Sequence, residues 1–410
     1  MNTRLLFMTP FAPRFDAPHG GRVSAQLIYR LAAKFDVAVV CLRDPLEPGT
    51  DEELRERCEL VVEIPRSSRP DPSLMSMRLR RLAALAQGVP GLVSRAAEPG
   101  YARRLREVVD DWRPHVVQVE LHEMGQYLPA LDGYPVRVVL VDHDPGAGAA
   151  RDLAGTGGLA RRISQDLEAR AWRRFTRRTG SRVDAAIVFT ERDRQTLGEE
   201  WTSMEIVRIA PGLDVPARAL DPVGASPPRL LFFGGYEHPP NADAARRLLE
   251  TIHPCVVSHH AQVVLDLVGP KPTLEMLRLA RVGVSVTDRV PSIDPYLNRA
   301  AVVVVPIRLG GGMRVKVLET VAAGKALVAS PRAVDGLDLP EGRAYLRAET
   351  DEEFCAAIVA LLADPERRRA LAVAARSWAE QNVGWDAVVE KYSGLYQRLL
   401  DSPPKALARA

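Results

Sequence analysis

The sequence predicts two α/β domains of similar size, each built on a doubly wound parallel sheet. Short apolar runs rich in β-branched residues alternate with longer segments of helical periodicity, which is typical of repeated strand–helix–strand units. A stretch rich in proline and glycine, at 211–228, interrupts the alternation once, and the pattern then begins again. A length of 410 residues also exceeds one ordinary domain core.

The first domain is predicted from its strand-like runs. They lie at 4–10, 36–42, 59–65, 115–120, 137–143, 185–190 and 205–210. Segments of helical spacing, such as 23–34 and 102–112, separate most of them. We therefore assign 1–215 to an N-terminal Rossmann-like domain and 216–228 to a linker.

The second domain, 229–384, repeats the pattern. Its strands are expected at 229–234, 262–269, 284–288, 301–306, 326–330 and 344–348, with helices at 243–252, 313–323, 352–363 and 365–381. The last helical pattern, 385–400, follows this domain and is a candidate to pack back onto the first one. Ligands bind outside the carboxyl ends of strands in open parallel sheets. Two such domains are expected to face a shared cleft, with hinge motion through 211–228.

Composition excludes several classes of protein. The net charge of +3 gives no reason to expect a nucleic-acid partner. The four cysteines include no CxxC pair, which predicts neither a zinc knuckle nor a disulfide framework and favours a reducing compartment. Cys41 and Cys58 lie in apolar runs and are expected to be buried. Neither a signal peptide nor a run of about 18 apolar residues is present, so we expect a cytoplasmic protein.

Two glycine-rich turns are candidate phosphate sites. Gly20 and Gly21 lie between the first strand and the first helix, where backbone amides and a helix N-terminus favour an anion. A tight turn without a ligand is the alternative there. The stronger signal follows the strand 301–306. It consists of Gly310, Gly311, Gly312, Met313, Arg314, Lys316 and Glu319.

This second segment fits a nucleotide diphosphate. Three consecutive glycines lose much conformational entropy on ordering, which is hard to explain for a plain connection. They suit a loop that wraps a diphosphate with backbone N–H groups. Arg314 and Lys316 add positive charge, and Glu319 could accept hydrogen bonds from vicinal hydroxyls. The alternative is a flexible loop before a solvated helix.

At these residues the chain resembles family 4 of the GT-B glycosyltransferases. The resemblance rests on GGGMRVKVLETVAAGKALVAS within 296–335, on 232–244, on Pro-Gly-Leu-Asp at 211–214 and on the Gly20-Gly21 turn. It implies a GT-B fold and an enzyme of the hexosyltransferase kind. It also implies a nucleotide-diphosphate sugar donor, retention of anomeric configuration and no metal or other cofactor.

The resemblance also assigns donor-site residues. Glu319 matches the glutamate that holds the ribose, the glycines at 310–312 match the diphosphate loop, and Arg289 lies where the base docks. This chain departs from the common pattern twice. Gly311 replaces the first of two glutamates, and Gly235 and His238 follow the first donor-domain strand where an Arg and a Lys are common. The GGG-x-R-x-K form resembles a subgroup that supplies its cations from Arg314 and Lys316.

The acceptor side is predicted at strand ends of the first domain. Glu120 ends one strand and is followed by His122 and Glu123. For His122, a structural role and a functional role are equally open alternatives. Asp142-His143-Asp144 ends the next strand and resembles the family's histidine segment. We name Glu120, His143 and Asp144 as catalytic candidates. The DxD formed by 142–144 also matches a metal signature of another glycosyltransferase fold, but the strand pattern is wrong for that fold.

One helix carries arginines on a single face. They are Arg170, Arg173, Arg174, Arg177 and Arg178. A solvated face is the plain interpretation, and attraction to anionic lipid headgroups is the alternative. For function, a glycosyltransferase of surface polysaccharide, glycolipid or natural-product pathways is the main hypothesis. A non-catalytic sugar-nucleotide-binding or scaffold protein is its rival, while an epimerase and a dehydrogenase lack the expected residues.

Overall fold

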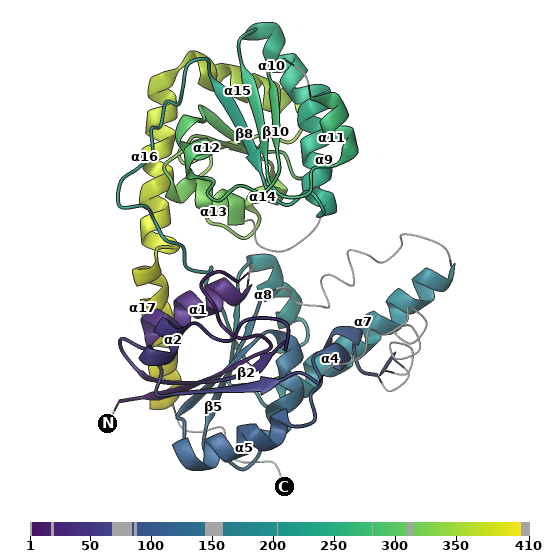
Figure 1. Cartoon of the computed structure of the whole chain (residues 1–410), viewed down its shortest axis with the longest axis vertical. Helices are drawn as coiled ribbons and strands as arrows, with labels where there is room; N and C mark the ends of the chain where they lie inside the picture. The colour runs from purple at the N-terminus through teal and green to yellow at the C-terminus, as the bar shows by residue number, and fades with distance from the viewer. Residues whose placement is uncertain are drawn as a thin grey trace. The chain divides into compact units, whose positions relative to one another are not determined.

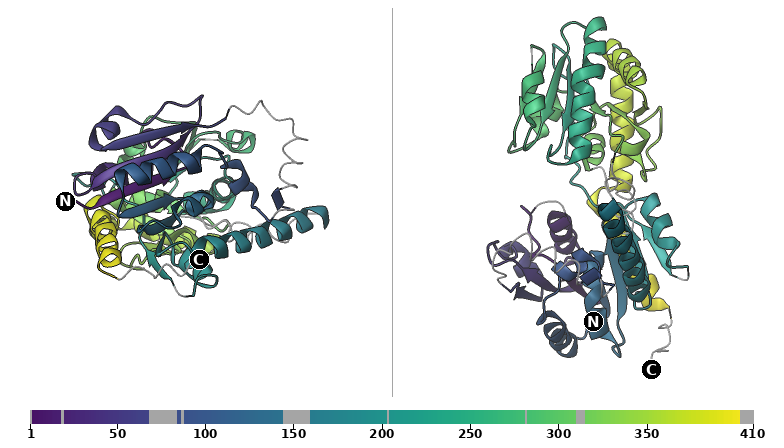
Figure 2. Two further views of the ribbon diagram at one scale, coloured as in Figure 1. Left: turned by 90° about the horizontal axis from the view of Figure 1, so that it is seen from below. Right: turned by 90° about the vertical axis from the view of Figure 1, so that its right-hand side faces the viewer.

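The computed structural model describes residues 2–17, 20–67, 84–85, 88–143, 159–202, 204–280, 282–309 and 315–402. The chain divides into two compact units (Figure 1). Unit 1 comprises Met1–Gly212 together with Val388–Ala410, and unit 2 comprises Leu213–Ala387. Each unit is an α/β domain with helices on both faces of one sheet (Figure 2).

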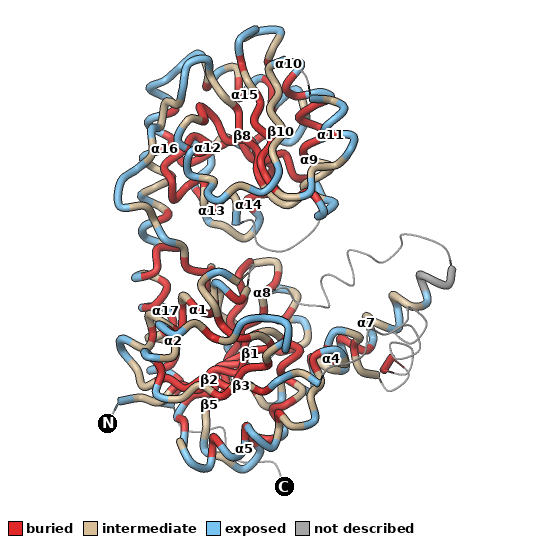
Figure 3. The backbone as a smooth tube through the Cα atoms, viewed as in Figure 1, coloured by how far each residue is buried: buried red, intermediate tan, exposed pale blue. Residues whose placement is uncertain are grey.

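The sheet of unit 1 is parallel throughout, in the order β3-β2-β1-β4-β5-β6-β7. Its strands are β1 Arg4–Thr9, β2 Asp36–Arg43, β3 Leu60–Pro65, β4 Val116–Glu120, β5 Arg137–Asp142, β6 Ala185–Val188 and β7 Glu205–Arg208. The central strands are buried on both faces (Figure 3), as expected for near-continuous apolar runs. All the strands predicted for this domain are confirmed.

The helices of unit 1 alternate with its strands along the chain. They are α1 Gly20–Leu31, α2 Glu52–Arg57, α4 Gly91–Arg95, α5 Tyr101–Trp112, the 3-10 helix η1 His122–Leu131, α7 Leu159–Gly180 and α8 Glu191–Gly198. In α5, Leu105, Val108 and Val109 are buried at the spacing of one helix face. These side chains join one core cluster with the apolar residues of the sheet.

The sheet of unit 2 is also parallel, in the order β10-β9-β8-β11-β12-β13. Its strands are β8 Arg229–Phe233, β9 Val264–Val268, β10 Val284–Thr287, β11 Val302–Val305, β12 Leu327–Ala329 and β13 Leu346–Arg347. In both sheets the strand order reverses beside the first strand, between β1 and β4 and between β8 and β11. Such switch points are where doubly wound sheets bind ligands.

Helices cover both faces of the second sheet. They are α9 Pro239–Arg247, the π-helix η2 Leu248–Ile252, α10 His253–His259, α11 Leu274–Leu279, α12 Asp294–Arg299, α13 Val315–Ala322, α14 Pro331–Val334, α15 Asp351–Ala363, α16 Pro365–Asn382 and α17 Trp385–Asp401. α15 packs against α10 and η2, and α13 packs against α16. α15 begins with a capping box, because Thr350 and Glu353 satisfy each other's backbone N–H groups.

The segment predicted as a linker, 216–228, belongs to unit 2 instead. The backbone N–H of Leu220 donates to Ala323 O at 3.1 Å, and that of Ala225 donates to Arg299 O at 2.9 Å. Arg376 Nη2 donates to Pro216 O at 2.5 Å. Its prolines remove donors that a helix or strand needs, so other parts of unit 2 satisfy the remaining N–H and C=O groups of the segment individually. Hinge motion through 211–228 stays a prediction, and the chain passes from unit 1 to unit 2 inside that range, between Gly212 and Leu213.

A disulfide contradicts the prediction made from cysteine spacing. Cys255 of α10 and Cys355 of α15 are bonded although 100 residues separate them. Spacing rules detect cysteines that lie close in sequence, whereas this pair is brought together by the packing of α10 on α15. Cys41 and Cys58 are free and buried, as expected.

The last helix, α17, has buried tyrosines that pack on unit 1. Tyr396 is 1% exposed, its hydroxyl donates to Gln118 Oε1, and its ring contacts Phe35 at 5.9 Å between centroids. Lys34 forms an ion pair with Glu390 of the same helix. Among the residues that the structure describes, no helix combines the length and apolar character needed to cross a membrane.

Candidate functional site

Glu120 is a buried carboxylate at the carboxyl end of β4. Its side chain is 2% exposed, and three donors satisfy its oxygens. Ser24 Oγ donates to Oε2 at 3.0 Å, Gln118 Nε2 donates to Oε1 at 2.5 Å, and His143 Nε2 donates to Oε2 at 2.8 Å. A buried carboxylate is stable only with such partners. Glu120 is therefore held rigidly and turns a hydrogen-bonded face toward His143.

His143 follows β5 and is fixed by this contact. A carboxylate only accepts, so Nε2 must carry the hydrogen shared with Glu120. The ring packs on Phe189 at 4.7 Å between centroids, and the side chain is 13% exposed. A Cβ added to Gly20 would lie 3.1 Å from His143 Nδ1. Glycine thus lets the N-terminus of α1 approach the imidazole edge more closely than a side chain would allow.

The structure therefore brings the predicted residues Gly20, Glu120 and His143 together. They lie at the carboxyl ends of β1, β4 and β5, beside the switch point of the sheet of unit 1. Gly21 is also buried in the first turn of α1, where an added Cβ would meet Ala17 Cβ at 2.8 Å. The third catalytic candidate, Asp144, lies outside the described residues.

A second buried pair lies next to the first. His122 Nδ1 and Asp142 Oδ2 are 2.8 Å apart, and both side chains are at most 3% exposed. The His122 ring lies among Trp172, Phe175 and Trp201. Its Nε2 is buried without a hydrogen-bond partner in the described part of the chain. Asp142, the first residue of the DxD pattern, is thus engaged inward by a histidine.

Glu123, next to this pair, is buried at 8% exposure. Burial raises the pKa of its carboxyl, and the negative charge of Asp142 raises that pKa further. The sequence suggested His122 and Glu123 as residues of interest, but it did not predict the contact with Asp142. The neighbouring ends of β4 and β5 create that contact, and only strand order in the folded sheet reveals it.

In unit 2, glycines form a tight corner at the carboxyl ends of β8 and β9. Gly234 has φ of 147° and Gly269 has φ of 150°, values that favour glycine. A Cβ on Gly269 would lie 2.3 Å from Gly234 O. The two backbones therefore meet where no side chain fits, and Gly235 follows directly.

Lys316, in the first turn of α13, is held beside this corner. Its Nζ donates to Asn241 Oδ1 at 2.7 Å and lies 5.2 Å from the centroid of the Phe232 ring. Asn241 Nδ2 in turn donates to Gly235 O at 2.8 Å. Two predicted residues, Gly235 and Lys316, are thus joined through Asn241, whose role the sequence did not reveal. An Asn in the first turn after a glycine pair was the available signal.

Gly310, Gly311, Gly312, Met313 and Arg314 lie outside the described residues.

The chain leading into that loop is anchored firmly. Arg308 pairs with Asp243 through hydrogen bonds of 2.8 and 2.9 Å, and Arg247 Nη1 donates to Pro306 O at 2.6 Å. The Arg308 guanidinium lowers the pKa of the Asp243 carboxyl. Glu319 lies in α13, three residues after Lys316, and is half-buried.

Two further predicted residues are exposed. His238 precedes α9 without capping it through its side chain, and Arg289 follows β10. Asp288 Oδ1 accepts hydrogen bonds from the backbone N–H groups of Lys271, at 3.0 Å, and Arg289, at 2.7 Å. These bonds lower the pKa of Asp288 and fix the backbone at the Arg289 position.

The arginine face of α7 is solvent-exposed at all the positions named from the sequence. Arg170 pairs with Asp166 and Arg177 with Glu200, each at 2.7 Å. Ile163 and Leu167 on the same helix are 54% and 41% exposed. α7 therefore presents positive charge and apolar surface together.

Residues 227–364 match the family described as Glycosyl transferases group 1. A search of curated proteins found no match. Among solved structures, the chain is similar to a sucrose-phosphate synthase from Thermosynechococcus elongatus at 16% identity and a TM-score of 0.68, covering 98% of this chain and 100% of that chain.

Two further structures show the same likeness. HepE from Anabaena, in complex with UDP, matches at 13% identity and a TM-score of 0.63, covering 97% of this chain and 100% of that one. WaaG, a glycosyltransferase involved in lipopolysaccharide biosynthesis, matches at 14% identity and a TM-score of 0.64. The match covers 96% of this chain and 99% of that one. The fold is therefore GT-B, and the part of unit 2 at 227–364 matches a glycosyltransferase family.

Proposed function

We propose that this enzyme transfers a sugar, with retention, from a nucleotide-diphosphate sugar to an acceptor hydroxyl of a glycan, a lipid-linked sugar or a small molecule. Unit 2 binds the donor and unit 1 presents the acceptor. The observation that carries the proposal is the corner in which Gly234, Gly235, Asn241 and Lys316 meet at the switch point of unit 2. HepE structures that hold UDP and UDP-glucose support the choice of donor class.

The donor diphosphate is the chemical centre of this proposal. Breaking the sugar–phosphate bond leaves the electron pair on a diphosphate oxygen, and charge stabilisation there is the main catalytic need. Lys316 supplies a cation whose position Asn241 holds. Backbone N–H groups of the glycine corner and the loop 310–312 would share the remaining charge without a metal. Glu319, about one turn beyond Lys316, would accept hydrogen bonds from the ribose.

On the acceptor side, His143 is the group proposed to touch substrate. Glu120 has its oxygens engaged by three donors, so it acts as a positioning residue that holds Nε2–H and leaves Nδ1 for the substrate. The acceptor oxygen forms the new bond to the sugar on the face that the diphosphate leaves. Its proton passes to the departing phosphate oxygen, while His143 orients the hydroxyl. Asp144 stays a third candidate by its place in the sequence.

Calorimetric titration of UDP, GDP, ADP and dTDP without metal tests the donor site. We expect one nucleotide to bind best and to lose at least tenfold in affinity in Glu319→Ala and Lys316→Met. Glu352→Ala, an exposed glutamate of α15, is the matched control and should bind like the wild type. Equal affinity in Glu319→Ala and wild type would remove the ribose assignment.

Turnover separates an enzyme from its rival, a sugar-nucleotide-binding or scaffold protein. The enzyme should hydrolyse the preferred donor slowly in the absence of acceptor, and the released sugar should at first keep the donor's anomeric configuration by NMR. His143→Ala should lower turnover at least 100-fold with donor affinity unchanged. Donor binding without hydrolysis, in wild type and variant alike, would favour the binding protein.

We also propose a peripheral contact of α7 with anionic membranes. Arg173, Arg174 and Arg178 are exposed on the same helix as the exposed Ile163 and Leu167. Each basic residue near an anionic surface contributes about 1 kcal/mol, so replacing three should weaken vesicle binding about 100-fold.

Cosedimentation with phosphatidylglycerol vesicles at low salt tests that contact. A variant of α7 with Arg173, Arg174 and Arg178 changed to glutamine is compared with the same change at three exposed arginines of α5. Those matched positions are Arg103, Arg104 and Arg106. Equal loss in both triple variants would indicate a general charge effect and would contradict a specific role for α7.

A further inference from the structure

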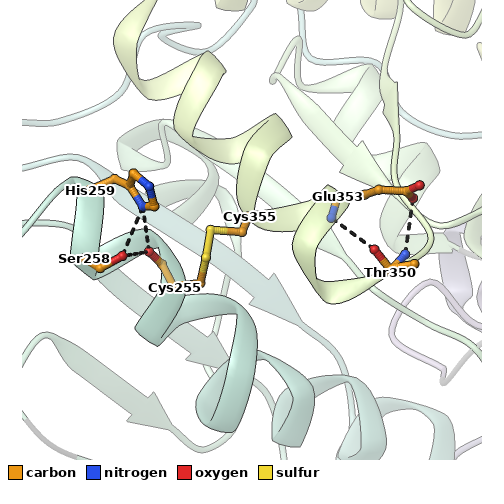
Figure 4. The surroundings of a disulfide bond; sticks show 6 residues. All are labelled: Cys255, Ser258, His259, Thr350, Glu353 and Cys355. Carbon is orange, nitrogen blue, oxygen red and sulfur yellow. Dashed lines mark hydrogen bonds between the residues drawn. A yellow bond between two sulfur atoms is a disulfide. The ribbon is translucent and has the colours of Figure 1, made fainter.

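The disulfide of unit 2 has a histidine beside it (Figure 4). Cys255 and His259 are four residues apart on α10, a spacing that places them on one helix face. Cys355 reaches them from the first turns of α15. The two sulfur atoms and one ring nitrogen of His259 all lie within 4.8 Å of one another. Residues of two packed helices thus gather two soft ligands and one imidazole at one point.

The hydrogen bonds of His259 define which ring nitrogen is available. Nδ1 lies 3.0 Å from Cys255 O and 3.1 Å from Ser258 Oγ. A carbonyl oxygen only accepts, so Nδ1 carries the hydrogen and Nε2 keeps its lone pair. Ser258 Oγ donates to the same carbonyl at 2.6 Å. Metal-binding histidines usually donate their second ring N–H to a carbonyl or carboxylate in this way, which fixes the tautomer.

We propose that the reduced form of this cluster is a zinc site, in which Cys255, Cys355 and His259 bind one Zn²⁺. A thiol or phosphine reductant supplies two electrons, and with two protons the disulfide becomes two thiols. Zinc then binds both sulfurs as thiolates and His259 through Nε2, and two protons are released to solvent. A water molecule completes the tetrahedron.

The distances needed are small. Zinc bonds of about 2.3 Å to sulfur and 2.0–2.1 Å to nitrogen place tetrahedral ligand atoms roughly 3.5–3.8 Å apart. One ring nitrogen of His259 already lies within 4.8 Å of both sulfurs, so the imidazole must turn and move closer to present Nε2, and the sulfurs, once unbonded, must separate to that spacing. His259 is exposed and Cys255 is half-buried, so the side chains can adjust and an ion can enter. Cys355 is buried and provides the fixed end.

The cluster supplies three protein ligands, and no fourth His, Cys, Asp or Glu belongs to it among the residues that the structure describes. Two thiolates and one imidazole suit zinc better than magnesium or calcium, which prefer oxygen. The free cysteines Cys41 and Cys58 belong to unit 1 and are buried, so they do not contribute. Zinc would join α10 to α15 in the reduced protein at the place where the disulfide joins them in the oxidised one.

The test uses the full chain without a polyhistidine tag. The protein is reduced with a phosphine under nitrogen, the phosphine is removed, and Zn²⁺ is titrated against a chromophoric chelator at neutral pH. We expect one zinc per reduced chain and none in the disulfide form. Binding should release two protons per zinc. Co²⁺ in place of zinc should give a thiolate-to-metal charge-transfer band.

Variants of one helix separate this site from adventitious binding. His259→Ala should weaken zinc binding at least tenfold and Cys255→Ser at least 100-fold. His260→Ala, its neighbour on the chain, should leave the affinity unchanged. Equal affinity in His259→Ala and wild type, or zinc bound equally by the disulfide form, would overturn the proposal. If the reduced chain loses its circular dichroism, recovery on adding zinc would support the site and failure to recover would refute it.

Discussion

Lys325 is a cation buried in unit 2, and its proton should make the stability of the protein depend on pH. The residue is 0% exposed. Its Nζ donates to Asp221 O and, at 3.1 Å, to Asn298 O, which ties the segment 216–228 to α12. Burial lowers the pKa of Lys325 from 10.5 to about 8, while the charge of Asp221 opposes the shift and that of Arg368 adds to it.

The size and sign of the effect follow from that shift. At about 1.4 kcal/mol per pKa unit, burial of the charged Lys325 costs on the order of 3 kcal/mol. Below pH 8 both folded and unfolded states are protonated, and the cost is fully present. Between pH 8 and 10.5 the folded state loses its proton first, so the free energy of unfolding rises with pH. By about pH 9.5 roughly 2 kcal/mol of the cost is relieved.

Urea melts of wild type and Lys325→Met, at about pH 7 and about pH 9.5, measure this contribution. Methionine leaves the carbonyls of Asp221 and Asn298 without their donor, so the variant should be less stable at both values. Burial raises the pKa of Cys41 and Cys58 to about 12. Their ionisation in the unfolded state lowers stability at high pH, equally in both proteins.

The comparison between proteins therefore isolates Lys325. We expect the wild type to gain about 2 kcal/mol more than the variant between the two pH values. A gain equal in both, within about 0.5 kcal/mol, would refute the account of a buried ammonium. Lys325→Gln, which keeps a donor but does not titrate, repeats the test if the methionine variant does not fold.

Three further predictions concern stability. Glu123→Gln should raise the Tm at neutral pH, because burial raises the pKa of the carboxyl and the wild type loses stability as pH rises through its titration; a lower Tm would contradict this. Thr350→Ala removes the oxygen that accepts the hydrogen bond from the Glu353 N–H and should lower the free energy of unfolding by about 1 kcal/mol in urea melts. An unchanged free energy of unfolding would contradict a stabilising role of this cap. Reducing the Cys255–Cys355 bond opens a loop of 100 residues and, without zinc, should lower the free energy of unfolding by up to about 4–5 kcal/mol. Urea melts with and without reductant measure this loss. A loss under about 1 kcal/mol would show that packing alone holds α10 to α15.

The strands could be predicted because buried strands consist of short runs of apolar, β-branched residues. β11, Val302–Val305, is four valines buried on both faces, and such runs have few other interpretations. Several short helices were not predicted. α12 and α14 span 6 and 4 residues, less than two helical turns, so no apolar period can repeat in them. The 3-10 helix η1 contains Pro129 and has no regular 3.6-residue pattern.

The site was predictable where neighbouring strands end and unpredictable where distant segments meet. Glu120 and His143 follow adjacent parallel strands, so their proximity follows from strand order. Gln118 meets Tyr396 across 278 residues, and no sequence pattern indicates that contact. The same holds for Asn241 with Lys316, 75 residues apart. In both cases the contact depends on which helix packs over which strand end, a property of the completed fold.

The packing of α17 on unit 1 has a consequence for biosynthesis. Unit 1 consists of Met1–Gly212 and Val388–Ala410, so the ribosome must complete unit 2 before the last part of unit 1 exists. Until then, Gln118 lacks its hydrogen bond from the hydroxyl of Tyr396. The apolar surface of unit 1 that buries the Tyr396 ring in the complete protein is exposed to solvent. The N-terminal part of unit 1 therefore stays incomplete while the ribosome translates the 175 residues Leu213–Ala387 of unit 2. A fragment ending at residue 212 should be prone to aggregation, and appending residues 388–402 through a flexible linker should rescue it.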